Sequence, residues 1–341
     1  MNINKQLLRL FEQKAGGFVS GEELSDTLQC SRTAIWKHVE RLRKEGYVFE
    51  AVPRKGYRLL EAPDKLDIPG LLARLRTQVL GRQIRYYDQI DSTQIKAHEL
   101  VDQGAEEGVL VVAEQQTAGR GRMGRKWHSP QGKGIWMSLV LKPRIPLHFA
   151  PQLTLLVAVA LCRTIRRVTS LPVGIKWPND LLVDGKKVSG ILLESSAEEE
   201  KLQYVIVGVG ISANLREQDY TDELKPIATS LSIASGRTID RTELLSEFLY
   251  DLEKLYELYH EAGFGPIKTL WEQLSVSLDR EVRTQTSQGP SEGTAIGLDD
   301  SGALIVRMKD NSVTKWYSGT VEFANPPHNQ INRRSMPLSR E

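Results

Sequence analysis

The sequence predicts an α/β protein with an N-terminal winged helix-turn-helix, a central α/β domain and a small C-terminal β-barrel of SH3-like type. Three observations support this prediction. The first sixty residues combine three helical patterns with two strand-like runs, the middle alternates helices with apolar strands, and the last part contains only short strands and turns. The 341 residues also exceed the size at which a single core stops growing, so we expect more than one domain.

The formal charge of the chain is unevenly distributed. The whole sequence carries a net charge of +2, whereas residues 1–60 contain 11 Lys/Arg and 7 Asp/Glu and so carry +4. A basic N-terminal part is typical of modules that bind polyanions, although basic segments also occur by chance. The charge favours a nucleic-acid partner without establishing one.

The remaining composition indicates an intracellular protein. Cys30 and Cys162 lie in helix-like apolar segments, which favours packed thiols in a reducing compartment over a disulfide. The six histidines lack the spacing of metal ligands, so we expect no zinc site. The N terminus does not resemble a signal peptide, and the longest apolar run, Leu153–Cys162, is about half of a membrane span. We therefore expect a cytoplasmic protein with no membrane partner.

Three helices are predicted at the N terminus. The first runs from Ile3 to about Lys14, the second follows a capping box at Ser20–Glu23, and the third begins at Ser31. Because polar and basic residues open the third helix, it has the character of a recognition helix that enters a major groove.

Two strand-like runs, Tyr47–Val52 and Gly56–Leu60, complete the order of a winged helix-turn-helix. The candidates for DNA contacts lie at the start of the third helix and at the hairpin turn: Ser31, Arg32, Thr33, Lys37, Arg54 and Lys55. The alternative is a module that contacts only proteins and carries solvated charges.

A short polar link at residues 61–65 precedes an α/β domain of about two hundred residues. Its predicted strands are Ile84–Tyr87, Val109–Glu114, Gly134–Leu141, Gly174–Trp177, Leu181–Val183, Val188–Glu194 and Tyr204–Gly210. Its predicted helices are Ile95–Gln103, Gln152–Val168 and Thr242–Glu261.

The segment from Ala118 to Trp127 holds three glycines and four cations. It satisfies G-x-G-x-x-G, but the sequence that follows is no helix, so the dinucleotide fingerprint fails. It also has the glycine spacing of a P-loop, but Arg125-Lys126 replaces the Lys-Ser/Thr that should follow. What remains is a flexible loop rich in guanidinium groups, which suits phosphate binding. A solvated basic loop or a second nucleic-acid patch is the alternative.

A second cluster of polar residues surrounds residue 180. Lys176-Trp177-Pro178-Asn179-Asp180-Leu181 lies at a strand-to-turn junction, and Lys187 follows shortly after. Such groups are costly to bury unless they are paired or bind a charged ligand. Asp180 is a candidate for a metal-bridged phosphate and Lys187 for an anionic reaction centre, whereas ordinary turn chemistry is the alternative for residues 178–180.

A third element, Asp91-Ser92-Thr93-Gln94, precedes the helix at Ile95. It is either an ordinary N-cap or a cluster of hydroxyls and amides that hydrogen-bonds a small polar ring.

Short strands are predicted after Val276, at Glu281–Thr286, Gly293–Leu298, Leu304–Met308 and Val313–Tyr317. The run Gly289–Gly293 matches G-x-S-x-G, but we expect it in a polar turn, which argues against a hydrolase nucleophile.

Taken in order, these motifs resemble those of bifunctional biotin protein ligases that also repress the biotin operon. The resemblance covers about residues 3–324 and depends on the winged helix, the 91–94 element, the glycine/arginine loop, the Lys176–Leu181 box, Lys187–Gly190 and the small β-domain. The glycine/arginine loop and the Lys176–Leu181 box indicate this family only when both are present.

The resemblance implies roles for individual residues. Biotin or its adenylate would be surrounded by Ser92, Thr93, Gln94, Gln116, Arg120, Gly121, Arg122 and Lys187, with Lys187, Arg122 and Asp180 as the catalytic group. Trp127, Lys176 and Asn179 would bind the nucleotide, Trp127 by packing on the adenine, unless Trp127 is a core residue beside Trp136. Asp180 would also contact Mg²⁺. Two positions depart from the common pattern, because Gln94 and Ser212 stand where the family usually has Asn.

The resemblance further implies ATP, Mg²⁺ and biotin as ligands, with biotinyl-5'-AMP as corepressor. The implied partners are a biotin carboxyl carrier protein, operator DNA and a second copy of the chain. The expected domains are residues 1–62, 66–275 and 276–325, with a disordered tail at 326–341. Two alternatives remain open, a lipoate-type ligase and a ligand-sensing repressor without ligase activity.

Overall fold

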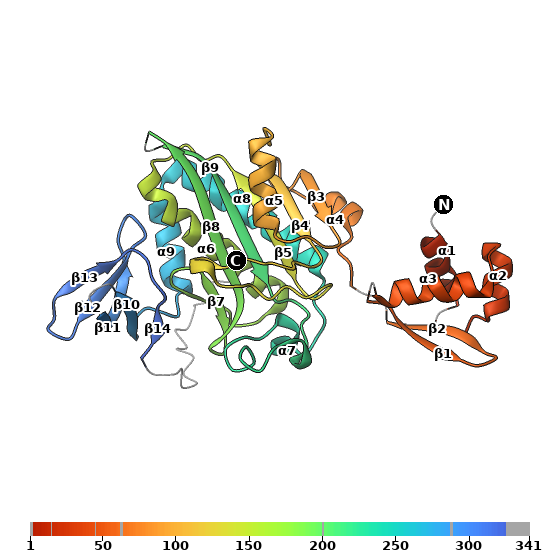
Figure 1. Ribbon diagram of the computed structural model, residues 1–341. Coiled ribbons are helices and arrows are strands. Elements are labelled where there is room, and N and C mark those ends of the chain that lie inside the picture. Colours follow the sequence, from red (N-terminus) through yellow and green to blue (C-terminus); the bar gives the residue numbers. More distant parts are fainter. Residues whose placement is uncertain are drawn as a thin grey trace, which may run out of the picture. The chain divides into compact units, whose positions relative to one another are not determined.

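The computed structural model describes residues 3–14, 16–44, 46–61, 64–199, 201–286 and 289–324 (Figure 1). The chain forms two compact units, residues 1–65 and residues 66–341. The tail expected at 326–341 lies outside the described residues.

The first unit contains three helices followed by a hairpin. The helices are α1 (Ile3–Gln13), α2 (Gly21–Leu28) and α3 (Arg32–Lys44), and the antiparallel strands are β1 (Val48–Val52) and β2 (Gly56–Glu61). Ser20 Oγ accepts the Glu23 N–H at 3.0 Å, so half of the predicted capping box is present at the start of α2. This order of elements confirms the predicted winged helix-turn-helix.

Eight buried apolar side chains hold the first unit together: Leu7, Phe11, Val19, Leu24, Ile35, Val39, Leu42 and Phe49. Seven of them come from α1, α2, α3 and β1, and Val19 lies just before α2. Within the helices, these residues recur at the spacing that puts them on one face. Val19 also pairs through its backbone with Tyr57, which ties the segment before α2 to the hairpin.

A seven-stranded sheet forms the centre of the second unit, in the order β3-β4-β5-β9-β8-β7-β6. The strands are β3 (Gln83–Tyr87), β4 (Val109–Ala113), β5 (Ile135–Leu141), β6 (Gly174–Lys176), β7 (Asp180–Val183), β8 (Lys186–Glu198) and β9 (Lys201–Ile211). The pair β3–β4 is parallel and all other neighbours are antiparallel.

Helices cover both faces of this sheet (Figure 1). They are α4 (Ile68–Arg74), α5 (Thr93–Asp102), α6 (Ala150–Thr169), α7 (Leu231–Ser235), α8 (Arg241–Ala262) and α9 (Phe264–Leu274), with short 3₁₀ turns at 122–124, 147–149 and 217–219. Strand alternation divides the core: Val109 and Val111 pack with Ala97 of α5, whereas Leu110 and Val112 belong to the larger cluster with α6 and α8.

The segment Leu147–Thr169, which contains α6, has the length and mean hydropathy (1.4) of a membrane-spanning helix. However, 72% of its most apolar window is buried inside the unit, and α6 packs against α8 and α9. An all-round apolar helix is expected in this position, because α6 lies between the sheet and other helices.

A smaller antiparallel sheet lies at the C terminus, in the order β13-β12-β11-β10-β14. Its strands are β10 (Glu281–Thr286), β11 (Gly289–Leu298), β12 (Leu304–Met308), β13 (Val313–Trp316) and β14 (Glu322–Phe323). The predicted order of domains is therefore confirmed. The placement of Gly289–Gly293 in a turn was wrong, because these residues pair with β10 as the start of β11. They still form no strand-to-helix elbow.

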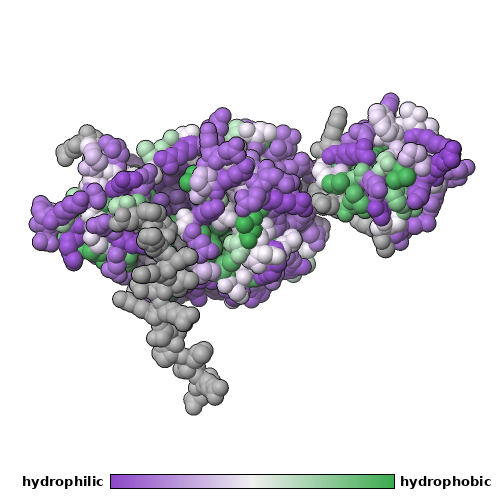
Figure 2. All heavy atoms as spheres, turned by 90° about the horizontal axis from the view of Figure 1, so that it is seen from below, coloured by the Kyte–Doolittle hydropathy of each residue, from purple (hydrophilic) through white to green (hydrophobic). Residues whose placement is uncertain are grey.

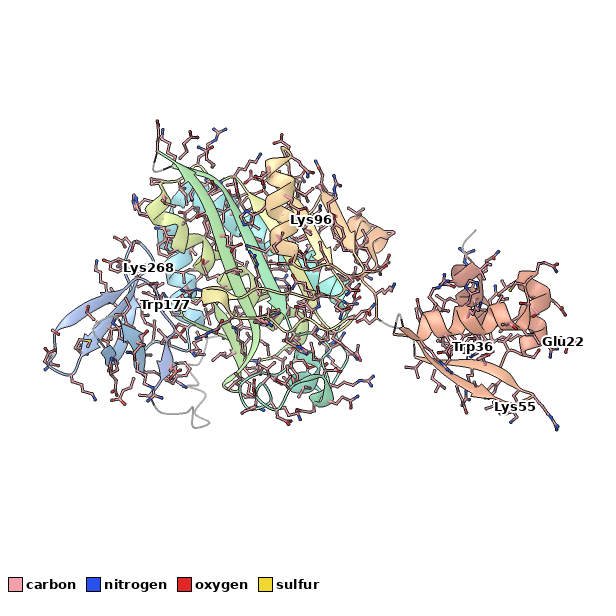
Figure 3. All side chains as sticks on the ribbon, in the orientation of Figure 1. Glu22, Trp36, Lys55, Lys96, Trp177 and Lys268 are labelled. Carbon is pink, nitrogen blue, oxygen red and sulfur yellow. The ribbon has the colours of Figure 1, made fainter. Side chains whose placement is uncertain are left out.

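The C-terminal sheet is fastened to the central domain through the turn after β11. Trp177 Nε1 donates to the Gly302 carbonyl at 3.2 Å, Gln152 Nε2 donates to the Asp300 carbonyl at 2.6 Å, and Lys268 pairs with Asp300 at 3.3 Å. Figure 3 labels Trp177 and Lys268 near this junction. Two of these three contacts bind backbone carbonyls, so they fix the position of the turn.

A fully buried ion pair joins the beginning of the second unit to its sheet. Arg241 Nη1 lies 2.8 Å from Glu114 Oε2, and both side chains have zero exposure. The other oxygen of Glu114 accepts the Leu66 N–H at 2.7 Å and the Tyr86 hydroxyl at 3.0 Å. Arg241 also donates to the Gly134 carbonyl at 2.9 Å. One carboxylate thus connects four segments of the chain.

We expect Arg241→Met to destabilise the second unit by about 3–5 kcal/mol, because it leaves the Glu114 carboxylate buried without its counter-charge. Urea unfolding followed by circular dichroism measures this change. Lys254→Ala is the matched control, since it removes an exposed pair with Glu257 on the same helix and should leave the midpoint unchanged. Equal midpoints for Arg241→Met and the control would contradict the assignment.

Candidate active site

The residues Ser92, Thr93, Gln94 and Gln116 form one buried polar group at the start of α5. Ser92 caps the helix, because its Oγ accepts the Gln94 N–H at 3.2 Å. Thr93 donates to Gln116 Oε1 from both its N–H (2.9 Å) and its hydroxyl (3.1 Å). Ser92, Thr93 and Gln94 are each at most 3% exposed. The segment Ser92–Gln94 is therefore both the N-cap of α5 and part of a polar cluster, because the same residues form both.

Ser138, in the middle of apolar strand β5, completes this group. Its hydroxyl lies 2.9 Å from Thr93 Oγ1 and donates to Gln94 Oε1 at 2.8 Å, while Gln94 Nε2 donates to the Ile206 carbonyl at 3.2 Å. Gly208 makes room for Gln94, since a Cβ there would lie 2.6 Å from Gln94 Oε1. The longer Gln side chain at position 94 is thus accommodated by hydrogen bonds and by a glycine.

The glycine/arginine segment is folded into a small hairpin. Gly121 N–H donates to the Arg125 carbonyl at 2.7 Å, Trp127 N–H donates to the Gly119 carbonyl at 2.9 Å, and Arg120 bridges to Lys126. The turn at its tip places Met123 at φ 56° and Gly124 at φ 73°. The segment whose composition suggested a flexible loop therefore adopts a hairpin closed by backbone hydrogen bonds.

Arg122 projects from this hairpin toward the Lys176–Leu181 box. Its Nη1 donates to Asn179 Oδ1 at 3.0 Å, and Asn179 Nδ2 donates to the Ile191 carbonyl at 2.7 Å. Burial lowers the pKa of Arg122, and the neighbouring Asp180 carboxylate opposes that effect. A half-buried guanidinium of this kind can bind a phosphate at little further desolvation cost.

Lys187, on β8, faces Asp180 across the β7–β8 pair. The Lys187 Nζ lies 2.6 Å from Asp180 Oδ1 and 5.0 Å from the centre of the Trp127 ring. One ammonium therefore contacts a carboxylate and an aromatic face at once. An anionic ligand that enters here competes with Asp180 for Lys187.

Trp127 lies over two glycines of the sheet. A Cβ at Gly210 would come within 2.3 Å of its Nε1, and a Cβ at Gly190 would come within 2.9 Å of its ring. Its Nε1 is buried and has no hydrogen-bond partner among the described residues. A buried indole N–H usually has an acceptor, so the lack of one among these residues is an unusual feature of Trp127.

The C-terminal sheet contributes to the same region. Arg125 Nη2 donates to Thr320 Oγ1 at 3.0 Å, and the Lys176 ammonium lies 5.3 Å from the centre of the Phe323 ring. Burial lowers the pKa of Lys176, with Asp180 raising it and Lys187 lowering it further. Residues about two hundred positions apart in sequence thus enclose one cationic site.

The structure brings most of the predicted residues together. Arg122, Lys176, Asn179, Asp180, Lys187 and Trp127 form the cationic part, and Ser92, Thr93, Gln94 and Gln116 form the polar part. Ser129 connects the two, since its Oγ accepts from Gln116 Nε2 and donates to the Trp127 carbonyl. Gly121 belongs to the hairpin, whereas Arg120 is exposed and contacts the others only through the hairpin backbone.

Several residues of this site were missed in the sequence. Ser138 had a usable signal, because it is the single polar residue in the apolar run Ile135–Leu141. Ser129 and Thr320 had none, since their roles depend on contacts formed only in the folded chain. Ser212 is 6% exposed, and its N–H donates to the Val188 carbonyl. We did not predict a ligand contact for Ser212, and no described contact joins its side chain to Arg122, Lys176 or Lys187.

The predicted DNA-contact residues lie in the first unit. Ser31 caps α3 by accepting the Ala34 N–H at 3.2 Å, and Arg32 forms an exposed pair with Glu22 at 3.4 Å. Thr33 and Lys37 are exposed on α3, and Arg54 and Lys55 are exposed at the hairpin turn. Figure 2 shows that this unit also carries a small apolar group, where the hairpin exposes Val48 (44%) and Leu60 (51%).

Comparison with known proteins agrees with this arrangement. Three family profiles match: an HTH domain at residues 4–58, the Biotin/lipoate A/B protein ligase family at 86–212, and the Biotin protein ligase C terminal domain at 277–324. The bifunctional ligase/repressor BirA of Bacillus subtilis is 49% identical over 321 residues, which cover 94% of this chain and 98% of that protein. The chain belongs to the BirA ligase/repressor family.

More distant members of this family give the same result. The bifunctional ligase/repressor BirA of Escherichia coli is 31% identical over 95% of this chain and 98% of that protein. The biotin protein ligase from Aquifex aeolicus, solved in complex with biotin and ATP, superposes with a TM-score of 0.61 at 30% identity and covers 71% of this chain and 98% of that one. The resemblance inferred from the sequence motifs is confirmed.

We expect Gly210→Ala to destabilise the second unit by about 1–3 kcal/mol, because the new methyl group overpacks the Trp127 indole. In a Trp127→Ala background the same substitution should cost almost nothing. A double-mutant cycle of urea midpoints measures the coupling. Gly265→Ala, whose Cβ meets no atom within 4 Å, is the control. An additive cycle would place the Gly210 effect elsewhere than in the indole contact.

Proposed function

We propose that this chain is an ATP-dependent biotin protein ligase that also represses biotin genes by binding their operator DNA. The observation that carries the proposal is the juxtaposition of Arg122 and Lys187 with the buried polar group around Gln116. The cations suit phosphate, and the buried hydroxyls and amides suit a small polar ring. Membership of the BirA family and the three matching domains support both activities.

The first reaction step needs no catalytic histidine. A carboxylate with a pKa of about 4 is ionised near neutral pH, so the biotin carboxylate itself attacks the α-phosphorus of ATP. The bond from that phosphorus to the bridging oxygen breaks, and diphosphate leaves. Arg122 and Lys187 offset the negative charge that gathers as the two anions meet.

Magnesium would be held mainly by the ATP phosphates. Among the described residues no group of three His, Cys, Asp or Glu side chains is arranged to hold a metal ion. A single carboxylate beside bound phosphates is a usual magnesium environment, and Asp180 has that position. When bound, the ion supplies charge neutralisation at the phosphates.

The second step transfers the biotinyl group to a lysine of a biotin carboxyl carrier protein. The lysine amine attacks the acyl carbon of biotinyl-5'-AMP, AMP leaves, and the amine gives up a proton. Asp180 is our candidate for the acceptor of that proton. The folded hairpin at residues 119–127 keeps water from the mixed anhydride until the amine arrives.

A biotin-dependent ATP–diphosphate exchange assay tests the ligase function. We expect exchange with biotin and none with lipoate, and labelling of a carrier domain only when its target lysine is present. Exchange with lipoate alone would indicate the lipoate-type alternative. Binding of biotin without any exchange would indicate a sensor that has lost the reaction.

We expect Arg122→Gly to release biotinyl-5'-AMP about 10 to 100 times faster, because a charge-assisted hydrogen bond contributes about 1.5–3 kcal/mol. Rapid dilution of enzyme loaded with labelled biotin measures the release. The control is Lys126→Gly in the same hairpin, since Lys126 is exposed and no described side-chain contact joins it to Arg122, Lys176 or Lys187. Unchanged retention in Arg122→Gly would remove this residue from the site.

Repression is proposed to follow from linkage between ligand and assembly. Bound adenylate orders the site, favours a homodimer, and the dimer binds a two-fold operator in the cytoplasm. The proposed domains are residues 1–62, 66–275 and 276–325. The HTH match and the exposed basic residues of α3 support the DNA-binding part.

We expect sedimentation velocity to show a mass increase to that of a dimer when biotin and ATP are added together. Biotin alone should shift the equilibrium less, because it lacks the adenylate. A monomer that binds operator DNA with unchanged affinity in the presence of both ligands would contradict the linkage.

A further inference from the structure

The recognition helix α3 carries an exposed tryptophan that none of the contacts described so far explains. Trp36 is 52% exposed, whereas the other five tryptophans of the chain are buried or half-buried. Trp36 and Lys55 of the hairpin both lie below the axis of α3 in Figure 3. An indole usually stabilises a fold by burying its large surface, so this one contributes little to the core.

Charged and polar side chains surround Trp36 on the helix. Its neighbours at positions i−4, i−3 and i+4 are Arg32, Thr33 and Glu40, and Lys37 follows it directly. The buried apolar residues Ile35, Val39 and Leu42 lie about a quarter turn around the helix from Trp36. A protein-binding surface would combine several apolar side chains, so a single indole in a charged face does not fit that role.

The charges on this face favour an anionic partner. Glu22 and Glu40 are already engaged, by Arg32 at 3.4 Å and by Arg43 at 2.8 Å. Lys37 and Arg41 are exposed, and within the part of the chain that the structure describes neither forms an ion pair. Lys37 and Arg41 are thus two exposed cations next to each other on one side of the indole, and exposed cations of this kind suit phosphates.

We propose that Trp36 reads thymine in the operator by packing its indole against the C5-methyl group in the major groove. The proposal rests on the DNA-binding function proposed above. The thymine methyl is the apolar feature that base pairs present in that groove, and an exposed ring beside two cations is suited to it. Lys37 and Arg41 hold phosphates and set affinity, whereas Trp36 sets sequence preference.

Duplex DNA selected from a random pool by the full-length chain, with biotin and ATP present, provides the probe. Each thymine of the selected duplex is replaced in turn by uracil, which lacks only the methyl group. We expect wild-type protein to lose about fourfold in affinity per contacted methyl, the change for burying one methyl-sized group. Trp36→Ala should bind the original duplex more weakly and no longer distinguish it from the uracil duplex. Trp36→Phe should keep part of the discrimination.

Lys37→Ala is the control, because loss of a phosphate contact weakens thymine and uracil duplexes equally and lowers the salt dependence. If wild-type protein selects no sequence at all, the proposed repressor function fails. If it selects a sequence but uracil costs nothing, or Trp36→Ala still distinguishes uracil, the role of Trp36 alone is overturned. Circular dichroism of each variant confirms that the exposed substitution leaves the fold intact.

Discussion

The buried pair of Glu114 and Arg241 is the interaction on which the second unit depends. Two charges with zero exposure are tolerated because they face each other and because other polar groups bond to them: the Leu66 N–H, the Tyr86 hydroxyl and the Gly134 carbonyl all take part. Glu114 is two residues before Gln116, so the pair also fixes where the chain leaves β4 and enters the site. One buried contact thus helps to position Gln116, a residue of the candidate site.

At the site, glycines of the sheet leave room for large polar or aromatic side chains that pack on them. Gly208 leaves space for Gln94, and Gly190 and Gly210 leave space for Trp127. Strand alternation puts these glycines on one face of the sheet, where the hairpin at residues 119–127 lies. The cationic residues Arg122, Lys176 and Lys187 then come from three separate segments, so charge is concentrated by the fold and not by any one stretch of sequence.

Much of the fold follows from the sequence, because β4, β5 and most of β9 are apolar runs with clear boundaries. The strand β8 is longer than the predicted run Val188–Glu194. The additional residues at its end, Ser195–Glu198, are mostly polar and pair with β9 in the outer part of a hairpin. No helix was predicted at α9, because Gly265 and Pro266 are residues typical of loops. Both lie in the first helical turn of α9, where they are tolerated. The charged residues that the fold brings together, Arg122, Lys176, Asp180 and Lys187, were named from the sequence, whereas Ser129 and Thr320 depend on contacts that only the tertiary structure creates.

The junction between Trp177 and the turn at Gly302 limits how far this protein can be shortened. A chain that stopped before residue 276 would lose the acceptor of the buried indole N–H and the Ser277 hydroxyl that binds the Trp177 N–H. The Lys176–Leu181 box would then face solvent on one side. Any shortened form that keeps this box packed therefore extends to about residue 324, and the terminal β-sheet is an integral part of the second unit.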